Sequence, residues 1–173
     1  YFKESTNNGM HALMANSKIF TKVNVPKYMF LLSKNVSSFI NFALTLVIFF
    51  LFALIDGVEF GWHFFSLVYP ISCLLVFNIG MGLILSALFV FFRDISYLYD
   101  VFTMLLMYMS AIFYTTETFG ETAKRLFYLN PVYVYITYFR EVVISSEIPD
   151  GALHVLCLIY ALAAVVLGAS VYK

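Results

Sequence analysis

The residues that could carry out acid–base or metal chemistry are spread along this chain and do not form a recognised motif. The three histidines, His11, His63 and His154, fall in separate stretches. Five carboxylates in the last third lack the spacing of metal ligands; they are Glu117, Glu121, Glu141, Glu147 and Asp150. We find no H-E-x-x-H, no G-x-S-x-G and no Gly-rich phosphate loop. The sequence therefore predicts neither a catalytic centre nor ATP hydrolysis by this chain.

The cysteines and the net charge give no indication of a disulfide-stabilised, metal-binding or nucleic-acid-binding protein. Cys73 and Cys157 both lie inside apolar runs, so they indicate neither a disulfide framework nor a metal site. The formal net charge is zero, which gives no sign of nucleic-acid binding.

A gap in the charges indicates a membrane protein. No Asp, Glu, Lys or Arg occurs between Glu59 and Arg93, and a bilayer core needs about 20 apolar residues in helical form. Hydrophobic residues make up 62% of the chain and charged residues 12%, against about 25% charged in soluble domains. We predict an all-α integral membrane fold.

Four apolar segments qualify as spans, at about residues 35–56, 63–92, 96–116 and 151–172. They would form a transmembrane domain over residues 35–173. A fifth apolar stretch, residues 126–139, is only about 21 Å long as a helix and contains Asn130-Pro131. We therefore assign residues 117–146 to an external re-entrant region that enters and leaves the membrane on one side.

The basic residues predict the orientation, because Lys and Arg favour the cytoplasmic side. With four spans one face holds Lys3, Lys18, Lys22, Lys27, Lys34, Arg93 and Lys173. Residues 1–34 are accordingly predicted to be a cytoplasmic segment with a short amphipathic helix.

Small and polar residues predict contacts between spans. Gly80, Gly82 and Ser86 on the second span, and Ala164 and Gly168 on the fourth, would allow close approach of helix backbones. Asn41 and Asn78 are expected to form hydrogen bonds with neighbouring helices. The tyrosines near Asn130-Pro131, namely Tyr128, Tyr133, Tyr135 and Tyr138, are typical of an interfacial aromatic belt, and such rings could also stack on sugars.

The order of several short patterns resembles a known family. A polar stretch, NSKIFTKVNVPK, precedes the first span; GMG then leads into FRDI; SAIFY ends the third span; and LNP precedes FR and the last helix. This set resembles the permease subunit of ABC-2 type (type V) exporters, in the branch that exports O-antigen, capsule or teichoic acid chains on lipid carriers.

The resemblance implies a bacterial cytoplasmic membrane protein with six spans, of which the first two are absent here. It implies a second permease copy and separate ATPase subunits that bind ATP and magnesium, leaving no cofactor in this chain. An ATPase-coupling helix would include Leu13, Asn16, Lys18, Ile19 and Lys22, and a cytoplasmic turn or gate would include Phe92, Arg93 and Asp94. The channel exit would include Tyr114, Asn130, Pro131, Tyr133, Tyr135 and Arg140. Many members carry Pro where this chain has Ala111, so we expect a straighter third span.

Two alternatives remain open at this point. One is an ABC-2 permease for drugs or small lipids, which would share the coarse topology. The other is an integral-membrane enzyme acting on lipid-linked sugars, for which the external carboxylates would supply the chemistry.

Overall fold

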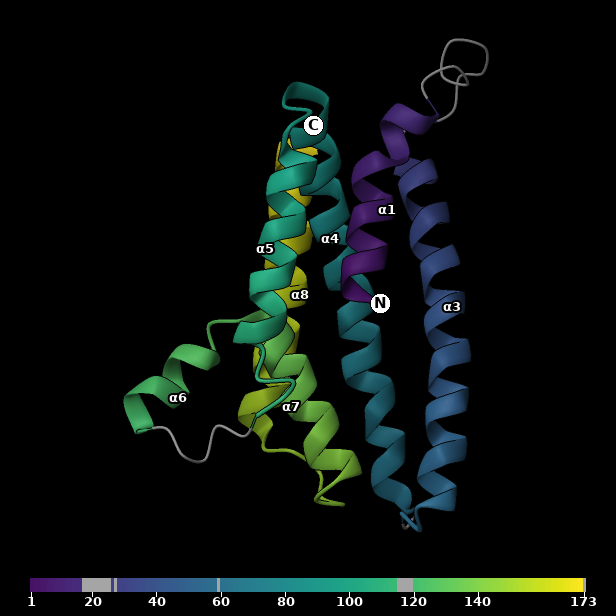
Figure 1. Ribbon diagram of the computed structural model, residues 1–173, viewed down its shortest axis with the longest axis vertical. Helices are drawn as coiled ribbons and strands as arrows, with labels where there is room; N and C mark the ends of the chain where they lie inside the picture. Colours follow the sequence, from purple (N-terminus) through teal and green to yellow (C-terminus); the bar gives the residue numbers. More distant parts are fainter. Residues whose placement is uncertain (17–25, 27, 59, 115–119, 173) are drawn as a thin grey trace.

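The secondary structure that the computed structural model describes is helical, as the sequence predicts (Figure 1). The model describes residues 1–16, 26, 28–58, 60–114 and 120–172. The helices are α1 (Phe2–Ala15), α3 (Tyr28–Ile55), α4 (Val68–Phe91), α5 (Ile95–Met109), α6 (Glu121–Phe127), α7 (Pro131–Val143) and α8 (Gly151–Tyr172), and a 3-10 turn, η1 (Trp62–Leu67), precedes α4.

Among the residues that the structure describes, three helical stretches are long and apolar enough to cross a membrane. They are Tyr28–Ile55, Trp62–Phe91 and Gly151–Val171. The third predicted span, 96–116, is represented by α5, which has 15 residues and is therefore only about 22 Å long. The predicted count of four spans is thus not confirmed.

Helix α5 ends where the sequence analysis expected it to continue. Ala111 has a φ of 50°, in the left-handed region that commonly terminates helices. The expectation of a straighter third span at Ala111 is therefore wrong. Residues 110–114 form turns and bends instead of a further helical turn.

Helix α4 lies at the centre of the bundle and packs closely against α8. A Cβ atom added to Gly80 would lie 2.4 Å from the backbone carbon of Ala164, and one added to Gly168 would lie 2.5 Å from the carbonyl oxygen of Gly80. Both separations are too short for a side chain. The expectation that Gly80, Ala164 and Gly168 allow a close approach of helix backbones is confirmed.

The opposite side of α4 packs against α1. Gly82 follows Gly80 by two residues, which turns it about 200° around the helix. A Cβ atom added to Gly9 of α1 would lie 3.1 Å from the Cα of Gly82. Gly80 and Gly9 therefore allow α8 and α1 to approach α4 from different sides.

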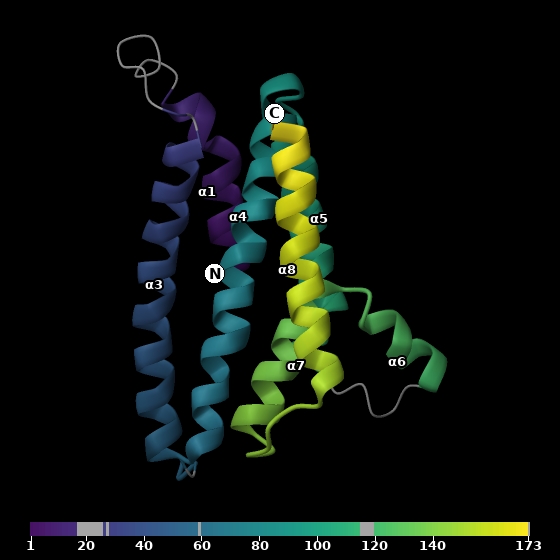
Figure 2. The same ribbon diagram turned by 180° about the vertical axis from the view of Figure 1, so that it is seen from behind.

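The position of α1 differs from the predicted cytoplasmic segment of residues 1–34. Figures 1 and 2 show α1 beside α3 and α4, with the N-terminus about half-way along the molecule. Residues Ser5, Thr6, Gly9, Met10 and Ala12 are buried in these contacts. Lys3, near the N-terminus, therefore does not lie at the end of the bundle that holds the turn between α4 and α5 (Figure 1). This position could not be predicted from the sequence, because α1 is rich in polar residues.

The connections between the helices otherwise lie at the two ends of the bundle as predicted. One end holds the C-terminal end of α1, the turn between α4 and α5, and the C-terminus (Figure 1). The other end holds the connection from α3 to α4 and the connection from α7 to α8 (Figure 2). Arg93 thus lies at the opposite end from Asp56 and Asp150.

The largest buried apolar cluster joins α4, α7 and α8. Its fully buried members include Val134, Tyr138, Val142 and Cys157. The hydroxyl of Tyr135 donates a hydrogen bond to the Cys157 carbonyl oxygen at 2.9 Å. Cys73 and Cys157 are free thiols buried among these apolar side chains.

We predict that Gly80→Ala will lower the free energy of unfolding by about 1–3 kcal/mol, because the added methyl would force α4 and α8 apart. Gly82→Ala is the matched control, since its Cβ would meet Leu31 Cδ1 at an ordinary 3.5 Å. Thermal unfolding in detergent would measure both. Equal melting temperatures for the two variants would contradict the prediction.

Candidate functional site

The predicted exit residues meet where α5 ends and α7 begins. The Asn130 side chain caps α7 by accepting hydrogen bonds from the backbone N–H groups of Val132 and Tyr133, with Pro131 in the first turn. The Asn130 amide also donates to Ser110 Oγ at 3.0 Å. Ser110 in turn donates to the Leu106 carbonyl oxygen at 2.6 Å. One asparagine thus starts α7 and ties it to the end of α5.

Arg140 makes a second connection between α7 and the segment that follows α5. Its Nη2 donates to the Ile112 carbonyl oxygen at 2.8 Å. Tyr114 is folded back toward α5, since its hydroxyl donates to the Tyr108 carbonyl oxygen at 2.9 Å. The structure therefore ties α7 to the end of α5 at two places, through Asn130 at the start of α7 and through Arg140 in its last turn.

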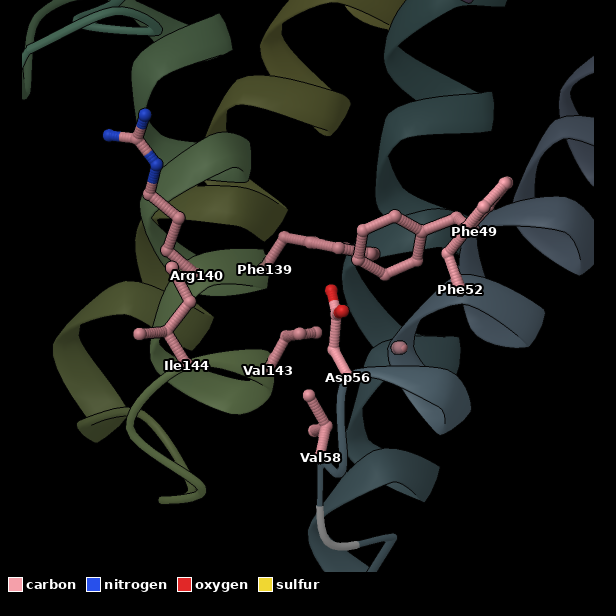
Figure 3. A pocket seen from close by; sticks show the side chains of 9 residues that line it. Phe49, Phe52, Asp56, Val58, Phe139, Arg140, Val143 and Ile144 are labelled. Atoms are coloured by element: carbon pink, nitrogen blue, oxygen red, sulfur yellow. The ribbon is translucent and has the colours of Figure 1, made fainter.

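A small cavity of about 320 Å³ lies between α7 and the end of α3. Phe49, Phe52 and Asp56 line it from the α3 side, and Phe139 and Val143 line it from α7 (Figure 3). In Figure 3 the guanidinium of Arg140 points away from the Asp56 carboxylate. The cavity wall is mostly apolar, with Asp56 as the carboxylate that points into it.

The tyrosines predicted at the exit are not open to a passing substrate in this arrangement. Tyr133 and Tyr135 are each only 5% exposed. The Tyr133 ring packs against Phe127 and Tyr128, while Tyr135 packs against Phe77. Aromatic composition alone could not distinguish these buried rings from rings that line a channel. We therefore do not retain Tyr133 and Tyr135 as residues that contact substrate.

The predicted cytoplasmic turn is exposed at the end of the bundle. Phe92 follows α4, and Asp94 occupies the N-cap position of α5 without a side-chain capping bond. Phe92, Arg93 and Asp94 are all exposed. Their position leaves the turn accessible to a partner protein.

The predicted coupling residues lie only partly within the described chain. Leu13 is half-buried in the last turn of α1. Asn16 follows α1, and its amide donates to the Ala12 carbonyl oxygen at 2.8 Å. Lys18, Ile19 and Lys22 lie outside the described residues. Leu13 and Asn16 are at the same end of the bundle as the turn between α4 and α5 (Figure 1).

A row of polar contacts between α1 and α3 was missed by the sequence analysis. The Asn41 amide donates to a Glu4 carboxylate oxygen at 2.9 Å, and the Asn8 amide donates to Ser38 Oγ at 2.9 Å. Ser5 donates a further hydrogen bond to the buried Asn35. The expected contact of Asn41 with a neighbouring helix is confirmed, but its partner Glu4 had not been anticipated. We call α1 with these partners the polar seam.

The polar seam continues from α1 to α5. Lys3 Nζ lies 3.4 Å from an Asp100 carboxylate oxygen, and both side chains are exposed. The buried Tyr99 donates a hydrogen bond to Thr6. A periodic signal for the α3 side was present in the sequence, because Lys34, Ser38, Asn41 and Thr45 recur at intervals of three and four residues.

Asn78 is the polar residue of α4 without a visible partner. It is fully buried, and neither atom of its amide has a hydrogen-bond partner among the described residues. The expectation that Asn78 bonds a neighbouring helix is therefore not confirmed.

Comparisons with known proteins indicate a transport family. The family described as ABC-2 type transporter matches residues 14–144. The chain is 25% identical over 155 residues to the O-antigen export system permease protein RfbA of Myxococcus xanthus, covering 87% of this chain and 59% of that protein. It is 24% identical over 148 residues to a protein of the same name from Klebsiella pneumoniae, covering 84% of this chain and 57% of the relative. The chain thus spans somewhat less than three-fifths of the length of these relatives.

We predict that Asn130→Ala will destabilise α7 by about 1 kcal/mol, because it removes both the helix cap and the bond to Ser110. Ser110→Ala is the matched control, since it removes the bond but leaves the cap, and its effect should be smaller. Thermal unfolding in detergent would measure both variants. The cap assignment fails if Asn130→Ala melts at the wild-type temperature.

We predict a pH-dependent gain in stability for Glu141→Gln. Burial, followed by the nearby carboxylates of Asp150 and Glu147, raises the pKa of Glu141 above its ordinary value of about 4.5. The folded state therefore favours the protonated acid, and the ionised form is destabilising as the pH rises through the folded pKa. Glu141→Gln should melt above wild type at pH 7 and equal it below about pH 4. Melting curves across this range would show the effect, and a difference independent of pH would contradict it.

Proposed function

The chain belongs to the ABC-2 type transporter family, and we propose that it forms part of the permease subunit of an ATP-driven exporter of lipid-linked polysaccharide. The observation that carries this proposal is the similarity, over more than four-fifths of the chain, to permeases named for O-antigen export. The long apolar helices support a multi-pass membrane protein.

The proposed assembly contains a second copy of the permease and ABC ATPase subunits in the bacterial cytoplasmic membrane. ATP and magnesium would bind to the ATPase. The end of α1 with Leu13 and Asn16, the following residues Lys18, Ile19 and Lys22, and the turn from Phe92 to Asp94 would contact it. The shared position of α1 and this turn at one end of the bundle supports a common partner there (Figure 1).

Asn130, Pro131, Arg140 and Tyr114 would lie near the exit for the polysaccharide at the other side of the membrane. The hydrogen bonds of Asn130 to Ser110 and of Arg140 to Ile112 support a defined arrangement of α7 relative to the end of α5. O-antigen is the proposed cargo, because the relatives' names specify it; capsule and teichoic acid chains share its lipid-linked chemistry.

The experiment that tests this function is purification of the full-length permease, expressed with its neighbouring genes, in detergent. We expect an ABC ATPase to co-purify, and its ATP hydrolysis to change when lipid-linked polysaccharide is added. A response to drugs or short lipids alone would favour the small-substrate permease. Absence of an ATPase, with turnover of lipid-linked sugar by the permease itself, would favour the membrane enzyme.

We predict that Lys18→Glu with Lys22→Glu will weaken association with the ATPase by about ten-fold, because like charges at a complementary interface are repulsive. Membrane insertion should be unchanged. Co-purification of the ATPase, normalised to the amount of permease, would measure the effect. Lys34→Glu is the control for a general effect of charge. Wild-type recovery of the ATPase by the double variant would place the contact elsewhere.

A further inference from the structure

The polar seam lies at a depth where lipid cannot form hydrogen bonds with its polar groups. Helix α3 has 28 residues and is therefore about 42 Å long, and Asn41 lies near its middle, roughly 20 Å from either end. A hydrocarbon core about 30 Å thick that falls within this length must include Asn41. The carboxylate of Glu4, which accepts the Asn41 hydrogen bond, lies at the same depth.

The side of α1 that carries Lys3, Glu4 and Asn8 is polar and exposed. The polar contacts of these side chains are made with α3 and α5. Charged side chains at membrane depth face the interior of a bundle or a water-filled cavity, because exposure to lipid costs several kcal/mol. The exposed part of the seam therefore requires a hydrated or polar neighbour.

The exposed groups of the seam match the chemistry of sugar hydroxyls. Glu4 and Asp100 supply acceptors, Lys3 supplies a donor, and the Asn41 amide supplies both. Tyr97, which is 76% exposed, precedes Asp100 by three residues on the surface of α5 and can offer a ring face to a sugar.

We infer that the exposed seam, formed by Lys3, Glu4, Asn41 and Asp100, lines the hydrated path taken by the glycan of a lipid-linked polysaccharide. This inference rests on the proposed function and assigns residues to the path. The mixture of acceptors and a donor favours a carbohydrate over an apolar drug. The opposite side of α3, with Ile40 and Val47, faces lipid instead.

Accessibility of introduced thiols to water tests the inference, because thiols react as thiolates. Asn41→Cys and Thr45→Cys place thiols one turn apart on the polar stripe of α3. Ile40→Cys and Val47→Cys are matched controls at similar depth, and the wild type supplies the baseline because Cys73 and Cys157 are buried. The full-length permease with its ATPase would be labelled in membrane vesicles with a membrane-impermeant methanethiosulfonate reagent. Normal recovery with the ATPase identifies folded variants.

We expect Asn41→Cys and Thr45→Cys to react about ten-fold faster than the two controls, since thiolate formation requires water. Added lipid-linked polysaccharide, extracted from membranes of the same cells, should slow their labelling. Labelling as slow as the controls would overturn the hydrated path, while ATPase recovery and export by the wild type would leave the proposed function intact. Fast labelling that the polysaccharide does not slow, in a permease that exports it, would overturn the assignment of the path to the glycan.

Discussion

The close approach of two helices to opposite sides of α4 is the constraint on which the bundle depends. Gly80 allows α8 to reach the backbone of α4 on one side, and Gly9 of α1 allows α1 to approach the backbone of Gly82 on the other. Without a hydrophobic driving force between helices in lipid, such close packing is a main source of association. The apolar cluster with α7 and the polar seam with α3 and α5 are both built around this arrangement.

The apolar elements could be predicted from the sequence, because a long run without charge has few alternatives to a membrane helix. The charges at Arg93, Asp56 and Asp150 likewise predicted which connections share an end. The position of α1 could not be predicted in this way. Its polar residues are satisfied by Asn35, Asn41 and Asp100, which lie far away in the sequence. A composition typical of an aqueous segment therefore belongs to a helix within the bundle.

In the exit region, too, some features could be predicted from the sequence and others could not. Asn130-Pro131 is a local signal for the start of a helix, and α7 begins there. The burial of Tyr133 and Tyr135 depends on which side of α7 meets α4 and α8, which is a property of the whole bundle. The early end of α5 depends on the left-handed backbone conformation of Ala111. The residue type alone does not predict this conformation. The start of a capped helix is thus easier to predict from the sequence than the direction in which a tyrosine ring points.

The polar character of α1 also bears on how the chain enters the membrane during synthesis. Each charge near the middle of an inserting helix costs about 2.5–3.5 kcal/mol, and residues 2–15 carry Lys3 and Glu4. The partner of Glu4 is 37 residues further along, on α3, and therefore reaches the membrane after α1. Insertion of α1 thus becomes favourable only when α3 can join it. The two helices are therefore expected to leave the translocon as a pair.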